Sequence, residues 1–513
     1  MEKLKSNIFL FFKKYKSQIY FYLILNCLVV FFISLASYVH IPLSGFKDRA
    51  LYTIHIILLQ FSISGYLYLI TLNKWIFRFV FCPVFFVLSL FSFWVFTQDI
   101  SVTQSLVTVV METKPSIVFD LLSVQYIVYI VFVLNVLFFV NRYYARIKPI
   151  EIKWIFVVIS LISISSYSFI EKRRNGTLRS RLPYSVFFGF NDYFEKPNYV
   201  LAQAPKEINS PIDSLKVILV LGETVRADHL GINGYKRQTT PLISKIKNIV
   251  SFQNIYTPHT YTGSSLPRII SSASINTNPL NKLVSVYDVY NSCNFNTVWF
   301  GNQELEVSYE SLVKTNKAVV LVDSLRSVYS FNKVLDENLL PPFKKEIIKK
   351  QRGLYSLHMI GSHWWYENRY RDIFRVFQPV MDSKHIPSLE AEQIINSYDN
   401  TILYLDFFLN SIIGSLDNID EPVVLIYISD HGEALGENGK WLHAQDIDAC
   451  KNPAMLVWYS EAYRKLYPDK IEALKKNKEK VFSTDVIYHS LLDLIKVEGM
   501  DYKNNLSVFR SLN

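Results

Sequence analysis

The stretch VILVLGETVRADHLGINGY, residues 217–235, indicates how the second half of the chain folds. Its first five residues are apolar and are either β-branched or leucine, which is typical of a strand buried on both faces of a sheet. A glycine ends this run, and Glu223 and Thr224 follow at once. Ligands of α/β proteins bind at the carboxyl ends of strands, so Glu223 stands where chemistry usually takes place. A simpler interpretation is a strand followed by Thr224 as a helix cap.

Similar strand-like runs recur along the rest of the chain, and helix-like segments separate them. The helix-like segments include residues 390–415 and 484–496. This alternation predicts an α/β fold built around a mainly parallel sheet. The strand-like runs are residues 215–221, 296–300, 317–323, 354–359, 423–429 and 453–459.

The first 170 residues are much more apolar than those of a water-soluble protein. Half of the 513 residues of the chain are hydrophobic, and in this part they form five runs that are almost free of charge. Each run is close to the roughly 20 residues that a helix needs to cross a bilayer. Five such runs in succession favour a transmembrane domain over the buried helices of a soluble core. The predicted spans cover about residues 18–38, 51–72, 75–96, 119–140 and 153–170.

Basic residues predict which ends of the spans face the cytoplasm. Five lysines precede the first span, Lys74 follows the second, and Arg142, Arg146 and Lys148 follow the fourth. Cytoplasmic loops are enriched in Lys and Arg, so we expect these ends to be cytoplasmic. With five spans, the chain beyond residue 170 is then outside the cytoplasm. We interpret residues 171–210 as a linker and residues 211–513 as the outer domain.

The charge of the chain points to membrane lipids as partners. The 54 Lys and Arg residues outnumber the 44 Asp and Glu residues, which gives a formal net charge of +10. A basic cluster at residues 172–181 directly follows the last span, where it would meet anionic headgroups. No aromatic–basic motif for nucleic acid accompanies it, so we expect no nucleic-acid partner.

The four cysteines form no recognisable motif. Cys27 and Cys82 fall in predicted spans, and Cys293 and Cys450 fall in the outer domain. Their spacing indicates neither a metal site nor a disulfide framework. Whether Cys293 and Cys450 pair is left open by the sequence.

Polar side chains follow four of the predicted strands. Because the carboxyl ends of parallel strands meet at one edge of a sheet, these groups are predicted to converge on a metal or phosphate site. Carboxylates combined with imidazole suit Zn²⁺, with Mn²⁺ as the second choice. The alternative is a salt-bridged Asp430–His431 pair that merely holds a loop. The side chains are Glu223, Asn302 and Gln303, His363, and Asp430 with His431, followed later by His443.

The segment YTPHTYTGSSLPRIISSAS, residues 256–274, is dense in hydroxyl groups. Thr262 stands just before an apolar run, residues 266–270, that is predicted to be helical. The free N–H groups at the start of a helix bind phosphate, and a metal-held Thr262 hydroxyl at that place would be a nucleophile. The alternative is an ordinary capped helix.

Taken together, these segments resemble the membrane-anchored phosphoethanolamine transferases of bacteria, which belong to the sulfatase and alkaline phosphatase superfamily. The resemblance covers nearly the whole chain. GETVRADHLGINGY resembles the first metal motif of the family, TYTGSSLPR its nucleophile motif, and SDHGEALGENGKWLH its last metal motif; LHMIGSH and SYDNTILYLD also match family segments. The resemblance implies Glu223, Thr262, Asp430 and His431 as zinc ligands, Thr262 also as the catalytic nucleophile, and His363 and His443 at the substrate phosphate. Asn302 and Gln303 are further substrate-binding candidates.

The resemblance also implies an activity and a place in the cell. Phosphoethanolamine would pass from phosphatidylethanolamine, through a phosphothreonine, to an envelope glycan or lipopolysaccharide acceptor. The protein would be a monomer in the bacterial inner membrane with its catalytic domain in the periplasm. The sequence leaves open the acceptor (lipid A, core or O-antigen), the number of metal ions, and the residue of the 97–118 loop that contacts the donor lipid.

Two other functions are compatible with the same segments. A membrane phosphoglycerol transferase of the same superfamily would share the threonine nucleophile. A catalytically inactive membrane sensor would keep only the fold. The presence of Glu223, Thr262, Asp430 and His431 argues against the sensor.

Overall fold

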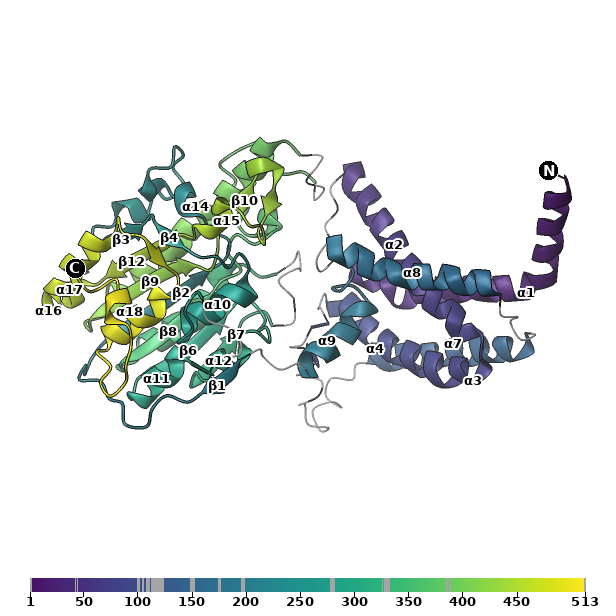
Figure 1. Ribbon diagram of the computed structural model, residues 1–513, viewed down its shortest axis with the longest axis horizontal. Helices are drawn as coiled ribbons and strands as arrows, with labels where there is room; N and C mark the ends of the chain where they lie inside the picture. The colour runs from purple at the N-terminus through teal and green to yellow at the C-terminus, as the bar shows by residue number, and fades with distance from the viewer. Residues whose placement is uncertain are drawn as a thin grey trace. The chain divides into compact units, whose positions relative to one another are not determined.

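The fold was analysed in a computed structural model of the chain. The chain divides into two compact units, Met1–Phe194, here called the helical unit, and a second unit that contains Glu195–Ser324 and Lys333–Asn513, here called the α/β unit. Figure 1 shows helices alone in the first unit and a sheet covered by helices in the second. The structure describes residues 2–41, 43, 45–98, 102–103, 106–107, 111, 124–147, 153–173, 177–194, 199–276, 282–324, 326, 333–383, 386 and 389–511.

The helical unit contains five helical stretches that are long and apolar enough to cross a membrane. Its elements include α1 (Glu2–Phe32), α2 (Gly45–Thr71), α3 (Lys74–Ile76), α4 (Cys82–Gln98), α7 (Val124–Arg146), α8 (Trp154–Arg173) and α9 (Tyr184–Phe194). Helix α9 lies within the range predicted to be a linker, and Leu178, Leu182 and Val186 pack into the core of the helical unit. The five apolar helices predicted from the sequence are confirmed.

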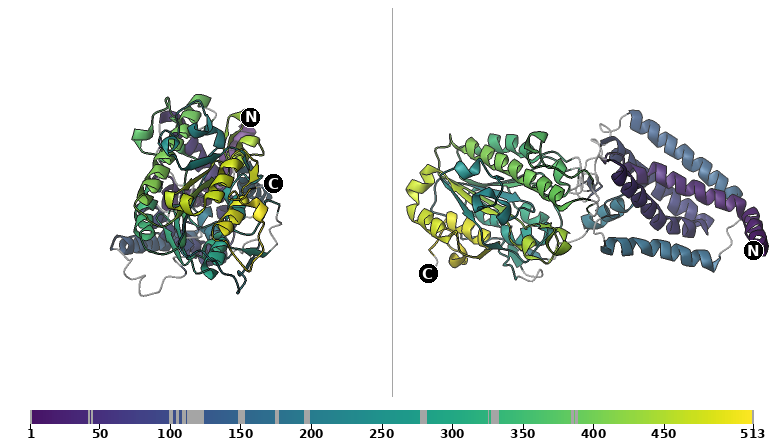
Figure 2. Two further views of the ribbon diagram at one scale, coloured as in Figure 1. Left: turned by 90° about the vertical axis from the view of Figure 1, so that its left-hand side faces the viewer. Right: turned by 90° about the horizontal axis from the view of Figure 1, so that it is seen from above.

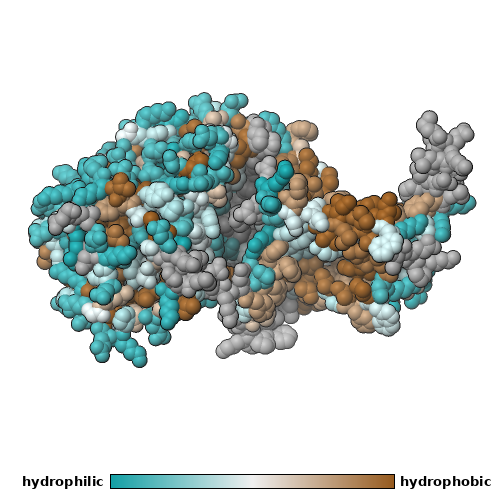
Figure 3. Space-filling view, in the orientation of Figure 1, coloured by the Kyte–Doolittle hydropathy of each residue, from teal (hydrophilic) through white to brown (hydrophobic). Residues whose placement is uncertain are grey.

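The surface of the helical unit suits acyl chains better than water. Phe138, Phe139, Ile155 and Ile162 are each at least 60% exposed, and Figure 3 shows the apolar surface gathered on these helices. An exposed apolar area of this extent is costly in water but matches the interior of a bilayer. Where α2 meets α8, Gly65 permits close approach, and its N–H donates to Ser163 Oγ at 2.9 Å. Small residues at such contacts are typical of membrane helices.

The α/β unit is built on a seven-stranded sheet with the order β3-β12-β9-β2-β8-β6-β7. Strands β9, β2, β8, β6 and β7 run parallel, and β12 is antiparallel to both of its neighbours. The predicted mainly parallel sheet is therefore confirmed. The strands are β2 (Lys216–Gly222), β3 (Ile249–Phe252), β6 (Asn296–Gly301), β7 (Ala318–Leu321), β8 (Gly353–His358), β9 (Val423–Ser429) and β12 (Met455–Tyr459).

Strand β2 occupies the middle of the sheet, where neighbouring strands and helices bury every one of its residues. Its odd-numbered side chains, Val217, Leu219 and Leu221, join a core cluster with residues of α10 (Thr262–Ile270), α11 (Val286–Ser292) and α18 (Val486–Leu494). The long helix α14 (Ala391–Leu416) lies on the other side of the sheet (Figures 1 and 2). The carboxyl ends of β9, β2, β8 and β6 consequently lie side by side at one edge.

The sequence did not predict β3, a four-residue strand at one edge of the sheet whose side chains alternate between buried and partly exposed. Such a short half-exposed run carries little apolar signal.

All four cysteines are free, and Cys293 and Cys450 are both buried. The question left open by their spacing is therefore settled: these two residues do not pair.

Candidate active site

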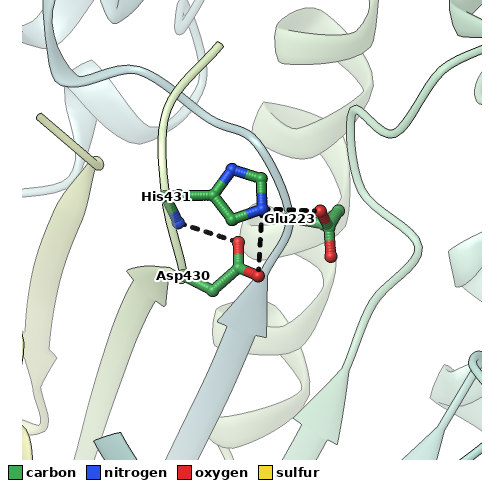
Figure 4. A group of neighbouring side chains, drawn as sticks. All are labelled: Glu223, Asp430 and His431. Carbon is green, nitrogen blue, oxygen red and sulfur yellow. Dashed lines mark hydrogen bonds and ion pairs between the residues drawn. The ribbon is translucent and has the colours of Figure 1, made fainter. Parts of the chain in front are cut away.

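Two neighbouring strand ends bring three side chains to one point. Glu223 follows β2, and Asp430 and His431 follow β9; their ligand atoms all lie within 4.8 Å of one another, and all three residues are buried. His431 Nε2 is 3.1 Å from Glu223 Oε1 and 3.4 Å from Asp430 Oδ2 (Figure 4). Two carboxylates and an imidazole at this spacing form a donor set that suits Zn²⁺.

The imidazole of His431 is oriented for metal binding. Its Nδ1 lies 2.9 Å from the carbonyl oxygen of Gly432, which can only accept, so Nδ1 is protonated and Nε2 is the nitrogen that would bind a metal ion after losing its own proton. His431 Nε2, Glu223 Oε1 and Asp430 Oδ2 are buried and make no hydrogen bond of good geometry within the described residues. Buried polar atoms are normally satisfied, so three such atoms aimed at one point fit a cation there.

The electrostatics of these three residues agree with this interpretation. Burial and the negative charge of Glu223 raise the pKa of Asp430 to about 7. Although burial opposes it, the nearby Asp430 and Glu223 raise the pKa of His431 to about 10. Burial alone would raise the pKa of Glu223, but the positive charge of the nearby His431 lowers it. A proton on His431 therefore balances the two carboxylates, and a bound metal would replace that proton.

Thr262 lies beside this group at the N-terminal end of α10. Its hydroxyl donates to Glu223 Oε2 at 2.7 Å. The amide of Gln303, which follows β6, also reaches Glu223 Oε2 at 3.3 Å and donates to the carbonyl of Met359 at 2.6 Å. The structure thus places Thr262 and Gln303 in contact with the same carboxylate.

Two further predicted histidines border the site. The ring of His443 is centred 5.1 Å from that of His431 and 5.3 Å from that of His363. His443 lies between Leu442 and Ala444, whose φ angles are +69° and +59°. Non-glycine residues in this left-handed region are strained, and such strain is concentrated at functional sites.

Each of these histidines has its own support. Nδ1 of His443 is 3.3 Å from Glu433 Oε2, and Tyr366 donates to the other oxygen of Glu433. Nδ1 of His363 lies 2.7 Å from the carbonyl oxygen of Trp364, so its Nε2 carries the lone pair. Burial lowers the pKa of His363 to about 3, so it is neutral in the unliganded site.

Asn302 is the predicted site residue that lies apart from the others. Its amide donates to the carbonyl of Val334 at 2.9 Å and to Asp336 Oδ1 at 2.8 Å. Asp336 in turn accepts from the backbone N–H groups of Ile360 and Gly361. Through Asp336, Asn302 thus connects the loop after β6 with the loop after β8. A substrate contact for Asn302 stays a prediction.

The turn that carries Glu223 is held by α14. Thr224 has a φ angle of +59°. The hydroxyl of Tyr398, fully buried in α14, donates to the Thr224 carbonyl at 2.8 Å and accepts from the Arg226 N–H at 2.9 Å. Gly361 approaches the backbone of Glu223 so closely that a Cβ atom there would lie 2.9 Å from its nitrogen.

Sequence reasoning missed several residues that shape the site. Glu433 stands within the quoted motif SDHGEALGENGKWLH but received no role. Tyr398 stands in SYDNTILYLD, and Arg369, whose guanidinium donates to the carbonyls of His363 and Trp364, belongs to no motif. Only the Asp-His-Gly-Glu spacing offered a usable signal, because Tyr398 acts on a distant segment and Arg369 stands in no motif.

Comparisons with known proteins agree with this geometry. The sulfatase family matches residues 216–497. The chain is 32% identical over 305 residues to phosphoethanolamine transferase EptA of Escherichia coli (strain K12). The aligned region covers 56% of this chain and 54% of that protein. The match thus spans about half the length of that relative.

Two solved structures extend the comparison. The soluble domain of lipooligosaccharide phosphoethanolamine transferase A from Neisseria meningitidis is 28% identical, with a TM-score of 0.54 over 60% of this chain and 97% of that chain. The integral membrane protein EptA from the same organism is 23% identical and shows the same fold. Its TM-score is 0.54, over 94% of this chain and 98% of that chain. The resemblance predicted from the sequence is confirmed, and the chain belongs to the sulfatase family.

Proposed function

We propose that the protein transfers phosphoethanolamine from phosphatidylethanolamine to a lipopolysaccharide acceptor of the bacterial envelope, and that it does so at a zinc site. The observation that carries this proposal is the Thr262 hydroxyl, 2.7 Å from Glu223 and at the start of a helix, beside the Glu223–Asp430–His431 group. The similarity to phosphoethanolamine transferases supports the choice of substrate class.

Glu223, Asp430, His431 and the Thr262 hydroxyl would hold the zinc ion. Zn²⁺ supplies positive charge that lowers the pKa of a neighbouring hydroxyl and neutralises a phosphate. Thr262 is the first residue of α10, and the positive end of the helix dipole there favours an anion. Positioning and charge neutralisation provide most of the rate enhancement in phosphoryl transfer.

In the first half-reaction, Thr262 Oγ1 attacks the phosphorus of phosphatidylethanolamine. The new Oγ1–phosphorus bond forms while the bond from phosphorus to the diacylglycerol oxygen breaks. Glu223 Oε2 is the acceptor nearest to the Thr262 proton, and the departing oxygen takes up a proton by way of the partly exposed His443. An acceptor oxygen then forms a bond to phosphorus while the Oγ1–phosphorus bond breaks; Thr262 Oγ1 takes its proton back from Glu223, and the proton of the acceptor leaves by way of His443.

His363 and His443 are proposed to hold the phosphate. The ring of His443 lies beside that of His431, and the ring of His363 lies beside that of His443. The charge of a phosphate in this space would raise the pKa of the His363 imidazole, so that a protonated nitrogen could donate to a phosphate oxygen. Charge-assisted hydrogen bonds of this kind are about twice as strong as neutral ones.

The direct test uses the full-length protein in vesicles of phosphatidylethanolamine without acceptor. We expect the mass of Thr262-containing peptides to increase by one phosphoethanolamine group. Vesicles of phosphatidylglycerol are the control, and labelling only from that lipid would show that the protein is a phosphoglycerol transferase instead. Absence of an adduct from either lipid, with no transfer to lipid A, would contradict the proposal.

The membrane arrangement gives a second test. We propose that the α/β unit lies in the periplasm and that the protein spans the inner membrane. Reporter enzymes fused after about residue 180 should be active only outside the cytoplasm, whereas those fused near Lys148 should be active only inside, because basic residues concentrate at cytoplasmic ends. The opposite pattern would place the active site away from its acceptors.

Tyr398 provides a third test, because its hydroxyl holds the turn that carries Glu223. Tyr398→Phe should weaken zinc binding by about 10-fold or more, as expected for a residue that orients a metal ligand. Zinc affinity and unfolding midpoint should be measured together.

The matched control is Tyr290→Phe. The buried hydroxyl of Tyr290 donates to the carbonyl of Leu491, also at 2.8 Å, and this hydrogen bond involves none of the metal-site residues. Each variant leaves one buried carbonyl without its donor, and Tyr398→Phe also leaves the Arg226 N–H without its acceptor, so both should lose some stability. Equal zinc affinities in the two variants would show that Tyr398 supports only the fold.

A further inference from the structure

The loop between β6 and α12 (Glu310–Val313) brings a further carboxylate, in addition to Glu223 and Asp430, close to the site. This loop supplies Gln303 to Glu223, and three residues later it supplies Glu306 to the start of α10. Glu306 Oε2 lies so close to Gly263 that a Cβ atom on that glycine would be 2.9 Å from it. Gly263 directly follows Thr262, so the carboxylate stands next to the proposed nucleophile while remaining partly exposed.

Glu306 is an acidic group for which the described residues supply no cationic partner. No Lys, Arg or His among them forms an ion pair with it. The neighbouring Glu304, by contrast, lies near the charge of Lys333. Burial, and after it the negative charges of Glu304, Glu223 and Asp430, raise the pKa of Glu306 to about 7, and a cation beside the carboxylate would lower it again.

A buried hydroxyl lies at the same place. Ser308 Oγ would be 3.0 Å from the same Cβ position on Gly263, and this hydroxyl can donate to the Glu306 carboxylate. The hydroxyl supplies no positive charge, so a carboxylate at this place is costly unless a cation completes it. A carboxylate and a hydroxyl together suit a small cation that donates hydrogen bonds.

We propose that Glu306, with Ser308, binds the ammonium group of the phosphoethanolamine and thereby selects the donor headgroup. This inference rests on the proposed function, which places the phosphate at Thr262. The ammonium is separated from the phosphorus by one oxygen and two carbons. A carboxylate beside Gly263, the residue that follows the nucleophile, is therefore within its reach. A headgroup without the ammonium would leave Glu306 unpaired next to two metal-binding carboxylates, which disfavours that donor.

The test compares two donors in the full-length protein. One is phosphatidylethanolamine, and the other is the same lipid with a hydroxyl in place of the ammonium. The wild-type protein should prefer the first by about 10- to 100-fold in kcat/KM, the range of one specific polar contact. Glu306→Gln, which keeps the shape, should raise KM for phosphatidylethanolamine and make the two donors nearly equal, with zinc content unchanged.

Glu310→Gln is the matched control, because Glu310 is on the same segment but pairs with Lys314 at 2.8 Å. It should retain the full preference. Glu306→Asp keeps the charge with a shorter reach and should retain part of the preference, which separates loss of selectivity from loss of folding.

The outcomes are distinguishable. If the wild-type protein transfers nothing from either lipid, the proposed function itself is wrong. If it transfers phosphoethanolamine and Glu306→Gln keeps the preference, the ammonium site is wrong. If Glu306→Gln instead loses bound zinc, the carboxylate is a metal ligand and the inference is overturned as well.

Discussion

Replacing Thr262 by alanine is expected to reduce transfer by more than about 1,000-fold, because loss of a covalent nucleophile removes the reaction path itself. The side chain is small and lies at the first position of α10, so the fold should persist. Metal content should fall only partly, because Glu223, Asp430 and His431 remain. The measurements are transfer of labelled phosphoethanolamine to lipid A, zinc content and unfolding midpoint in the full-length protein.

Ser264→Ala is the matched control for this variant. Ser264 stands in the same first turn of α10, but its hydroxyl contacts His259 Nδ1 at 2.8 Å and not the carboxylates. It should keep most of its activity. Substantial turnover by Thr262→Ala would refute the nucleophile assignment and make Thr224 the next candidate.

The histidines should divide into a metal ligand and two phosphate-binding groups, and this division gives the second large effect. His431→Ala is expected to lose both tightly bound zinc and activity, because Nε2 of His431 directly faces Glu223 and Asp430. Loss of one ligand from a buried site leaves two carboxylates close together without compensation. Zinc content measured after dialysis should decrease in proportion to activity.

His443→Ala and His363→Ala should behave differently. Each should retain about one zinc per chain and turn over about a hundredfold more slowly, as for the loss of one transition-state hydrogen bond, worth roughly 2–4 kcal/mol. If His363 were only a buried structural residue, its variant would lose stability but keep a normal rate per folded molecule. Full zinc retention by His431→Ala, or zinc loss in His443→Ala, would contradict this division.

The sequence predicted the strand ends well because buried parallel strands have a strong and simple pattern. The predicted run at 423–429 coincides with β9, and the run at 215–221 differs from β2 by one residue at each end. Because β2 and β9 are parallel neighbours in the sheet, their carboxyl ends bring Glu223, Asp430 and His431 together. Their roles follow from residue chemistry, which is visible in the sequence.

The parts that could not be predicted depend on contacts between distant segments. Successive residues at the end of a strand point in different directions, and the sequence alone does not show which of Asn302 and Gln303 faces the site. In the structure Gln303 reaches Glu223, and Asn302 holds Asp336. The support from Tyr398 to Thr224 joins residues 174 positions apart, and no local pattern encodes such a contact.

The four cysteines, all free, have a consequence for maturation of the protein. Burial raises the pKa of both Cys293 and Cys450 to about 11, so little reactive thiolate exists at neutral pH. The α/β unit therefore contains no disulfide and gains no stability from cross-linking of its unfolded chain. Its assembly is uncoupled from the thiol-oxidising machinery of the cell, and growth under reducing conditions should not limit the amount of folded enzyme.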